Sequence, residues 1–243
     1  MRQRLRLAIK QVSKRAFAER FRKLEFEWMR RIILVRHGES QINAVWKEKA
    51  IFCGQLDTPL TEKGRLQALD VGRLLADASQ FRISHAVSST LVRAVDTLQL
   101  IRQQLTTAPE LLPATPAFNE RSLGLFEGRA KEDVYREFPE YESDPDYCNF
   151  RDHYQQKAPG GENLSEVTSR AWPALESLLK LAQPDVLVVA HCQVIRCLIA
   201  RAISLDPNEI SSLKIPHAVP ILLTQSATKR FRLARNFESD AKG

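Results

Sequence analysis

Hydrophobic and polar positions follow two patterns that alternate along this chain. Short apolar runs rich in β-branched residues predict buried strands at 31–35 (RIILV) and 185–190 (DVLVVA), and the segment 84–88 (SHAVS) is predicted to be another strand. Two later runs, at 219–224 and 229–233, predict strands that close the sheet.

Between these runs, apolar residues recur at the three- and four-residue spacing of helices. Ser89 or Thr90 suits the cap of one helix, because a hydroxyl can accept a hydrogen bond from a free amide at a helix start. Strands that alternate with helices predict an α/β fold, a three-layer sandwich in which helices flank a mainly parallel sheet. The expected helices span residues 61–78, 90–105, 131–138 and 165–181, and His191 to Arg201.

Positive charge is concentrated at the N-terminus. The 243 residues include 36 Lys and Arg and 29 Asp and Glu, a formal net charge of +7. Residues 1–31 hold eleven basic and three acidic residues, which leaves 25 basic and 26 acidic residues in 32–243. A protein that binds nucleic acid through its folded surface would spread its positive charge, so no nucleic-acid partner is expected.

Residues 1–28 form a basic amphipathic extension ahead of a predicted domain at 29–243. Apolar residues in the extension recur at helical spacing, and its first 18 positions contain no acid. Three interpretations stay open. The extension is a solvated or packed helix, or it meets a membrane surface or organelle-targeting machinery, or, least favoured, it contacts nucleic acid.

The remaining composition indicates a protein of a reducing compartment. No run of about 18 apolar residues and no secretory signal are present, so no membrane span is expected. The four cysteines (Cys53, Cys148, Cys192 and Cys197) form no CxxC pair. We therefore expect reduced thiols and a cytoplasmic location, with organelle targeting through residues 1–28 as the alternative.

Residues suited to phosphate chemistry follow the predicted strands. Arg36 and His37 come after the first strand, Arg93 lies in the first turn of the helix after the second strand, and His191 follows the strand DVLVVA. In parallel sheets such positions meet at one edge. Arginines can hold a phosphate, a histidine can attack it, and a carboxyl such as Glu120 can protonate the leaving oxygen. This set predicts phosphoryl transfer without a metal or another cofactor, because the arginines supply the positive charge.

The motifs around these residues resemble those of the histidine phosphatase superfamily, the phosphoglycerate mutase-like proteins. They cover about residues 31–225, in the order ILVRHGES, GQLDTPLTEKGRLQA, SSTLVRAVDT, FNERSLGLFEG, PGGEN and VLVVAHCQVIR. The resemblance implies a phosphoglycerate mutase-like fold. It also implies that His37 is the nucleophile, Glu120 the proton donor, and His191 a positively charged partner of the transferred phosphoryl group.

The same resemblance implies which residues bind the substrate. Arg36 and Arg93 would complete the phosphate pocket, with Asn43 and Gly54 near the phosphate or the substrate. Lys131 aligns with a lysine that binds the substrate carboxylate in the mutases.

Three other features complete the picture of the expected site. Cys192 stands where the family often has a glycine. Its side chain would narrow the turn that follows the strand DVLVVA. His217, in KIPHAVP, is interpreted as structural. Residues 129–157 hold five basic and eight acidic side chains, which favours a monophosphate or a neutral leaving group.

Phosphatases and mutases share the first half of the implied reaction. A phosphatase then lets water attack the phosphohistidine, whereas a mutase excludes water and returns the phosphoryl group to another hydroxyl. The short segment 120–162, the GQLDTPLT motif and Leu123, in place of a mutase tyrosine, resemble the phosphatases. Lys131 and KIPHAVPILL resemble the mutases.

We therefore expect a metal-independent phosphatase of small phosphorylated metabolites. A 2,3-bisphosphoglycerate-dependent phosphoglycerate mutase is the alternative. A catalytically silent anion-binding or interaction module is the third hypothesis.

Overall fold

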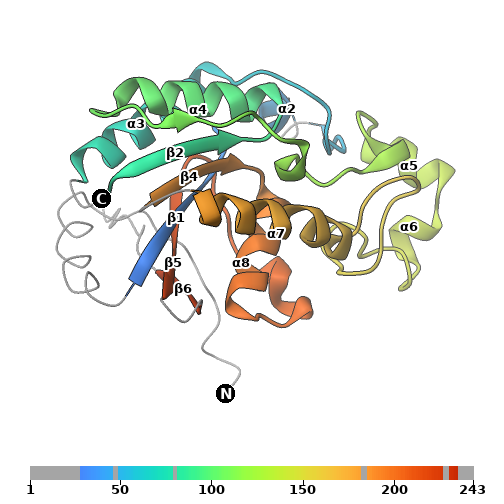
Figure 1. Ribbon diagram of the computed structural model, residues 1–243. Coiled ribbons are helices and arrows are strands. Elements are labelled where there is room, and N and C mark those ends of the chain that lie inside the picture. The colour runs from blue at the N-terminus through green and yellow to red at the C-terminus, as the bar shows by residue number, and fades with distance from the viewer. Residues whose placement is uncertain (1–27, 46–48, 79–80, 182–184, 227–229, 235–243) are drawn as a thin grey trace, which may run out of the picture.

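The computed structural model describes residues 28–45, 49–78, 81–181, 185–226 and 230–234. The strands of the described chain form one six-stranded sheet with the order β3-β2-β4-β1-β5-β6 (Figure 1). They are β1 (Trp28–Arg36), β2 (Ile83–Ser88), β3 (Glu110–Leu111), β4 (Asp185–Ala190), β5 (Pro220–Ser226) and β6 (Phe231–Ala234). β3, β2, β4 and β1 run parallel, and β5 pairs antiparallel with both β1 and β6, so the sheet is mostly parallel, as expected.

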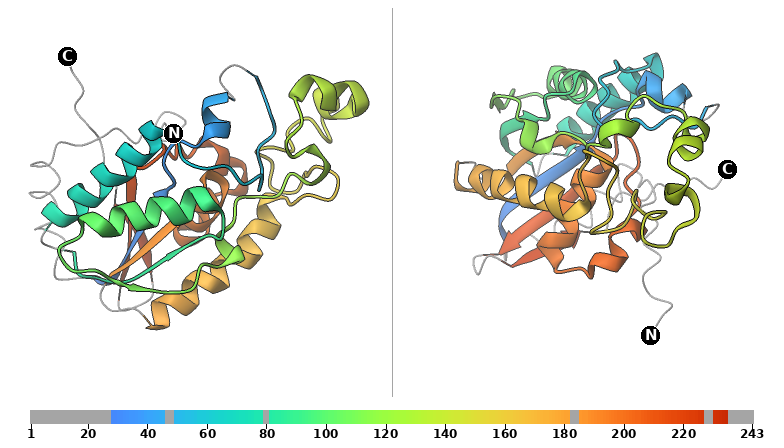
Figure 2. Two further views of the ribbon diagram at one scale, coloured as in Figure 1. Left: turned by 90° about the horizontal axis from the view of Figure 1, so that it is seen from above. Right: turned by 90° about the vertical axis from the view of Figure 1, so that its right-hand side faces the viewer.

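Helices cover both faces of the sheet, which confirms the three-layer arrangement. α3 (Glu62–Asp77) and α4 (Val92–Gln104) lie on one face, and α7 (Leu164–Leu181) and α8 (Cys192–Ile203) lie on the other (Figure 2). Alternate residues of β1 enter the two cores: Ile32 packs with α7 and α8, and Ile33 packs with α3 and α4. Because both faces are covered, β4 is buried along its whole length, which explains its unbroken apolar run.

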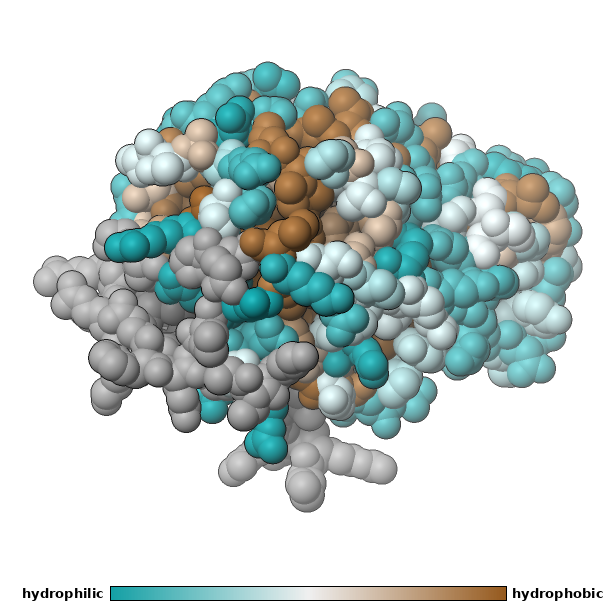
Figure 3. Space-filling view, in the orientation of Figure 1, coloured by the Kyte–Doolittle hydropathy of each residue, from teal (hydrophilic) through white to brown (hydrophobic). Residues whose placement is uncertain are grey.

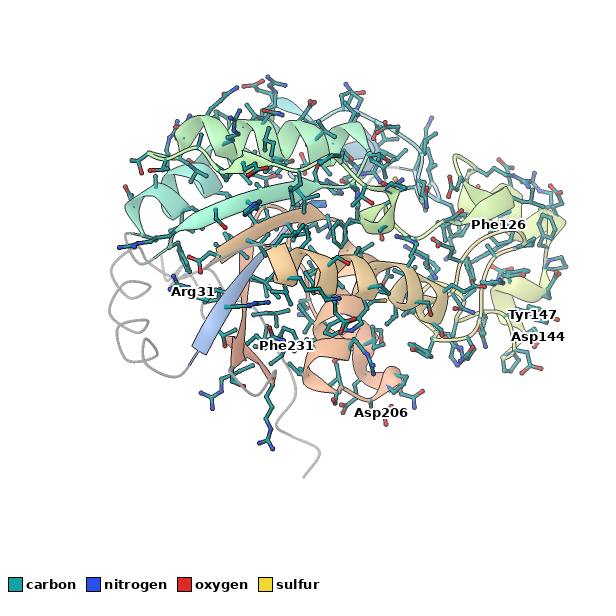
Figure 4. All side chains as sticks on the ribbon, viewed as in Figure 1. Arg31, Phe126, Asp144, Tyr147, Asp206 and Phe231 are labelled. Carbon is teal, nitrogen blue, oxygen red and sulfur yellow. The ribbon has the colours of Figure 1, made fainter. Side chains whose placement is uncertain are left out.

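A lobe beside the sheet is built from shorter elements around an aromatic cluster. It contains α5 (Lys131–Glu137) and α6 (Glu140–Ser143), and its cluster includes Phe52, Phe126 and Phe150. Figure 4 shows Phe126 and Tyr147 in this lobe, away from the sheet. The remaining short elements are α2 (Gln41–Val45) and three 3₁₀ turns, η1 (Pro116–Phe118), η2 (Gly124–Phe126) and η3 (Pro207–Ser212).

The prediction that Ser89 or Thr90 caps α4 was wrong. The N-cap is Leu91, and the free amide of Val92 donates instead to Asp57 Oδ1 at 2.8 Å. Both hydroxyls have other partners, because Ser89 Oγ lies 2.7 Å from His191 Nε2 and Thr90 Oγ1 donates to Asn119. The start of α4 is therefore capped by Asp57, from a distant loop. Ser89 instead contacts His191.

The basic extension falls almost wholly on residues 1–27, which lie outside the described residues, so its role stays a prediction. On the face drawn in Figure 3, hydrophilic residues cover much of the described surface, and hydrophobic ones form a band across the region of α4 and β2. Among the described helices, we find none with the length and apolar character that crossing a membrane requires.

Candidate active site

The loop after β1 and the first turns of α4 and α8, which follow β2 and β4, border a cavity of about 660 Å³. Such a volume accommodates a small organic substrate. Most of the residues expected from the sequence line it, namely Arg36, His37, Asn43, Gly54, Arg93 and Glu120. The parallel strands bring these residues together, although they are far apart in the chain.

His37 directly follows β1 and is only 3% exposed. Its amide donates to the carbonyl of Ala190 at 3.1 Å, which ties it to the end of β4. Its ring atom Nδ1 lies 2.7 Å from the carbonyl oxygen of Gly38. Because a carbonyl only accepts, Nδ1 carries the hydrogen, and in the neutral ring Nε2 keeps the electron pair.

The surroundings of His37 keep its ring neutral. Burial lowers the pKa of His37 well below its usual value, and the neighbouring His191, Arg93, Arg36 and His217 lower it further. An unprotonated nitrogen near two arginines is suited to attack a phosphorus atom.

The two glycines of the motifs RHG and TEKG pack against each other. A Cβ on Gly38 would overlap the backbone of Gly64, and a Cβ on Gly64 would overlap the backbone of Glu39. Gly38 also donates its amide to Thr97 Oγ1 at 3.0 Å, and Thr97 donates to the carbonyl of Arg93. These contacts join β1, α3 and α4 around the nucleophile.

Two anchored guanidinium groups border the cavity. Arg93 is 2% exposed and donates to the carbonyls of Leu56, at 2.8 Å, and Gly54, at 3.1 Å. Arg36 donates through Nη1 to the carbonyl of Ile215 at 2.8 Å, and its buried Nε has no hydrogen-bond partner among the described residues. A guanidinium has five N–H groups, so each arginine keeps donors for a phosphate.

His191 is fully buried behind His37 and does not line the cavity. The ring centroids of the two histidines are 4.9 Å apart, and His191 Nδ1 has no hydrogen-bond partner among the described residues. Burial, then Arg93, Arg36 and Arg170, lowers the pKa of His191 well below its usual value. In the site without substrate, this lowered pKa favours the neutral ring, and the positive charge expected on His191 beside a transferred phosphoryl group stays a prediction.

The carboxylate of Glu120 lies at the start of α8. Its Oε1 accepts from the amide of Arg121 at 2.9 Å and from the amide of Gln193 at 3.2 Å. Glu120 lies on the segment between η1 and η2, whereas His37 directly follows β1. The two side chains therefore reach the cavity from different parts of the fold.

The structure separates the other expected binding residues. Asn43, on α2, lines the cavity and accepts from Ser40 Oγ at 2.8 Å. Gly54 has a left-handed backbone (φ +50°), and its carbonyl holds Arg93. Lys131 does not line the cavity, because its Nζ lies over the ring of Tyr135, 5.0 Å from the centroid. The structure therefore does not bring Lys131 together with the other expected residues, and its contact with substrate stays a prediction.

Sequence reasoning missed His217, which lines the cavity rather than serving only as a structural residue. Its ring centroid is 5.3 Å from that of His37. The next residue, Ala218, has a left-handed backbone (φ +49°) and donates its amide to the carbonyl of Arg36 at 2.9 Å. A left-handed alanine has no sequence signature, so the turn that brings His217 to the cavity could not be predicted.

Arg121 is a second residue that the sequence analysis did not select. Its side chain lines the cavity, is almost fully buried, and donates to the carbonyl of Phe150. Burial lowers the pKa of this guanidinium. Its position directly after Glu120 in FNERSLG was the available signal.

The charge of the cavity differs from the charge expected of residues 129–157. Only Arg151 and Asp152 of that segment line the cavity, so its other charged side chains do not bear on the substrate. The lining has six cationic side chains and three carboxylates, a net charge of +3 that suits an anionic substrate. The charge of segment 129–157 therefore carries little information about the substrate, because most of its acidic side chains do not line the cavity.

The thiols at the site are not activated. Cys192 and Cys53 both line the cavity, and burial raises the pKa of each, that of Cys53 to about 11. Within the described ranges, no group of three or more His, Cys, Asp or Glu residues is placed to hold a metal ion.

Residues 32–236 match the family described as the histidine phosphatase superfamily (branch 1). Similar curated proteins include the 2,3-bisphosphoglycerate-dependent phosphoglycerate mutase of Bartonella henselae, 33% identical over 80% of this chain and 92% of that protein. The enzyme of the same name from Nitrobacter winogradskyi is 31% identical over 82% of this chain and 93% of that protein.

Several solved structures of similar fold are named as phosphatases. A mycobacterial glucosyl-3-phosphoglycerate phosphatase with inorganic phosphate has a TM-score of 0.68 and 25% identity, over 84% of this chain and 95% of that chain. The alpha-ribazole phosphatase from Shigella flexneri has a TM-score of 0.68 and 23% identity, over 88% of this chain and all of that chain. At 23% identity the second match shows the fold alone.

Proposed function

This chain belongs to the histidine phosphatase superfamily, and we propose that it is a metal-independent phosphatase of small phosphorylated metabolites. The observation that carries the proposal is the state of His37. Its Nδ1–H is held by the carbonyl of Gly38, its ring is neutral, and two anchored arginines stand beside it. These are the requirements for attack by nitrogen on a phosphate ester.

In the first step, the electron pair of His37 Nε2 forms a bond to phosphorus as the bond from phosphorus to the ester oxygen breaks. The protonated carboxyl of Glu120 gives its proton to that oxygen, and the alcohol leaves. Arg36 and Arg93 hold the charge of the transferred group. The product is a phosphohistidine at His37.

In the second step, water attacks the phosphohistidine. The carboxylate of Glu120 takes a proton from the water, a new oxygen–phosphorus bond forms, and the bond from phosphorus to Nε2 breaks. Orthophosphate leaves, and His37 is again neutral. The proton that Glu120 gave in the first step is thereby restored.

Three features of the cavity favour hydrolysis over mutase activity. Lys131 lies on Tyr135, outside the cavity, so it does not supply the carboxylate-binding cation expected of a mutase. Leu123, which replaces the mutase tyrosine, lines the cavity with an apolar side chain. Asp152 adds a carboxylate to the wall and pairs with Arg196 at 3.0 Å.

The alternative is a 2,3-bisphosphoglycerate-dependent phosphoglycerate mutase. It is favoured by the names of the curated relatives, which are 31% and 33% identical over most of the chain. The net positive cavity would also accept a bisphosphate.

One assay separates the two functions. The purified full chain is given a panel of phosphate monoesters that includes phosphoglycerates, and orthophosphate release and phosphoryl exchange between hydroxyls are measured side by side. We expect release to exceed exchange for every substrate that is turned over. Exchange in excess of release would establish the mutase, and a panel with no turnover and no acid-labile phosphoenzyme would favour a silent binding module.

A further inference from the structure

We infer that Arg170 and Glu162 are positioning residues that hold the loop of Glu120 and so set the place of the proton donor. The inference rests on the proposed function, in which Glu120 protonates the leaving oxygen. Neither Arg170 nor Glu162 lines the cavity, so neither is placed to touch the substrate.

The segment that carries Glu120 needs support from outside. From 119 to 123 the chain belongs to no strand or helix, and only the short turns η1 and η2 flank it. Its carbonyl groups therefore lack the regular partners that a sheet or helix supplies, and side chains must satisfy them. A proton donor on such a segment is only as well placed as those side chains make it.

Arg170, on α7, supplies most of the donors. Its Nη1 donates to the carbonyl of Ala117 at 2.8 Å and to that of Pro116 at 3.3 Å. Its Nη2 donates to the carbonyl of Asn119 at 2.8 Å and to that of Glu120 itself at 3.2 Å. One guanidinium thus binds four carbonyls that lead up to and include the proton donor.

Glu162, in the motif PGGEN, orients the guanidinium of Arg170 and also binds the loop of Glu120 directly. Its Oε1 lies 2.7 Å from Arg170 Nε, and its Oε2 lies 2.9 Å from Nη2, a two-point pairing that sets the plane of the fork. The same Oε2 accepts from the amide of Ser122 at 2.9 Å. The pair therefore holds the backbone on both sides of the Glu120 side chain.

A further contact, from a separate segment of the chain, holds the same residue. Gln55 Nε2 donates to the carbonyl of Glu120 at 2.9 Å, and the Glu120 carboxylate accepts from the start of α8. With its backbone held by Gln55, Arg170 and Glu162, the carboxyl has little freedom relative to His37. A displacement of about 1 Å at a reacting group can cost on the order of 10²-fold in rate, so this support matters for the chemistry.

The role predicts a specific defect rather than a general loss. Without the planar guanidinium of Arg170, the Glu120 carboxyl would be less well positioned. Proton transfer to the leaving oxygen would then be slower. Esters with a poor leaving group need that proton, whereas p-nitrophenyl phosphate leaves well without it. Binding of the phosphate by Arg36 and Arg93 would be unaffected.

The test compares kcat/KM for p-nitrophenyl phosphate and for an alkyl phosphate in five forms of the full chain. They are the wild type, Glu120→Gln, Arg170→Lys, Glu162→Gln and a control, Arg73→Lys. Lysine keeps the charge of Arg170 but not its planar fork. Arg73 is an ion-paired arginine too, bound to Asp70 on the exposed side of α3, and does not line the cavity.

We expect Glu120→Gln to lower kcat/KM for the alkyl phosphate by about 10²-fold or more, with a smaller loss for p-nitrophenyl phosphate. Arg170→Lys and Glu162→Gln should show the same preference, with at least about a tenfold loss for the alkyl ester and KM for p-nitrophenyl phosphate close to that of the wild type. Arg73→Lys should change neither substrate. Glu162→Gln keeps the test decisive if Arg170→Lys fails to fold.

Two failures are distinguishable. If Glu120→Gln affects both esters equally, the proposed role of Glu120 is wrong, whatever Arg170 does. If Glu120→Gln shows the preference but the folded Arg170 and Glu162 variants lose activity equally on both esters, or lose none, the positioning role is overturned.

Discussion

The ring atom Nδ1 of His37 lies 2.7 Å from the carbonyl oxygen of Gly38, the next residue in the chain. The nucleophile is therefore oriented by its own motif, before any substrate binds. The bond decides which nitrogen carries the hydrogen and leaves Nε2 to attack.

Replacing His37 by alanine should abolish both turnover and the phosphoenzyme, because it removes the nitrogen that attacks phosphorus. The loss should be on the order of 10³-fold or more. Single-turnover assays with ³²P-labelled substrate and acid quench would measure it. His85→Ala is the matched control, since His85 faces Glu110 at the sheet edge and does not line the cavity. Undiminished turnover in His37→Ala would refute the mechanism.

The rate of phosphoenzyme formation should persist at acidic pH. Because burial and nearby cations lower the pKa of His37, its ring stays unprotonated below the ordinary value of about 6.5. The acid limb of kcat/KM, corrected for ionisation of the substrate phosphate, should therefore lie below about pH 6.5. A limb centred at the ordinary histidine pKa would show that His37 is not the buried neutral nucleophile described above.

The stability of the fold should fall as the pH falls, because the pKa values of both His37 and His191 are lowered in the folded protein. Below about pH 6.5 these two histidines bind protons in the unfolded chain but stay neutral in the folded protein. The free energy of unfolding is therefore highest above that pH and falls below it. The two rings together give a slope of up to about 2.7 kcal/mol per pH unit. Urea unfolding at several pH values measures it, and the slope in His191→Asn should be shallower than in the wild type.

Gly54→Ala should impair phosphate binding more than an alanine placed at another glycine with a left-handed backbone. Gly54 has φ +50°, and an added Cβ would overlap the carboxylate of Glu127. We expect KM to rise, since the carbonyl of Gly54 holds Arg93, and stability to fall by more than the strain of about 1–2 kcal/mol. Gly160→Ala, at φ +69° with open space around it, shows the strain alone. If Gly54→Ala and Gly160→Ala change KM equally, Gly54 has no specific role in phosphate binding.

A chain that starts at Met29 should fold and keep its phosphatase activity. The pairing of β1 with β4 begins at Arg31, and all the residues that line the cavity lie beyond it. Thermal melts and kcat/KM of the shortened chain test this prediction. Loss of folding would show that residues 1–28 belong to the domain rather than extending it.

Most of the fold could be predicted from the sequence, because its main signals are local. The apolar runs that became β1 and β4 are buried on both faces, and the periodicity at 165–181 became α7. The cap of α4 could not be predicted, because Asp57 reaches it from another loop while Ser89 pairs with His191. The two-residue β3 also lacks a sequence pattern of its own.

The motifs led to His37, Arg36, Arg93 and Glu120 because each stands beside a strand or turn that the chain pattern reveals. They could not reveal that Lys131 turns to Tyr135, or that few acids of segment 129–157 face the cavity. Side-chain direction depends on packing partners that are remote in sequence.

By itself, the sequence determined the layers of the fold, the order of the motifs and the family to which they belong. Only the tertiary structure decided that burial lowers the pKa of His191, that His217 joins the cavity through a left-handed Ala218, and that Arg170 holds the loop of Glu120. The physical reason is the range of the forces. Hydrophobic periodicity acts over a few residues, whereas burial, charge and hydrogen bonds at the site depend on segments that meet only in the folded chain.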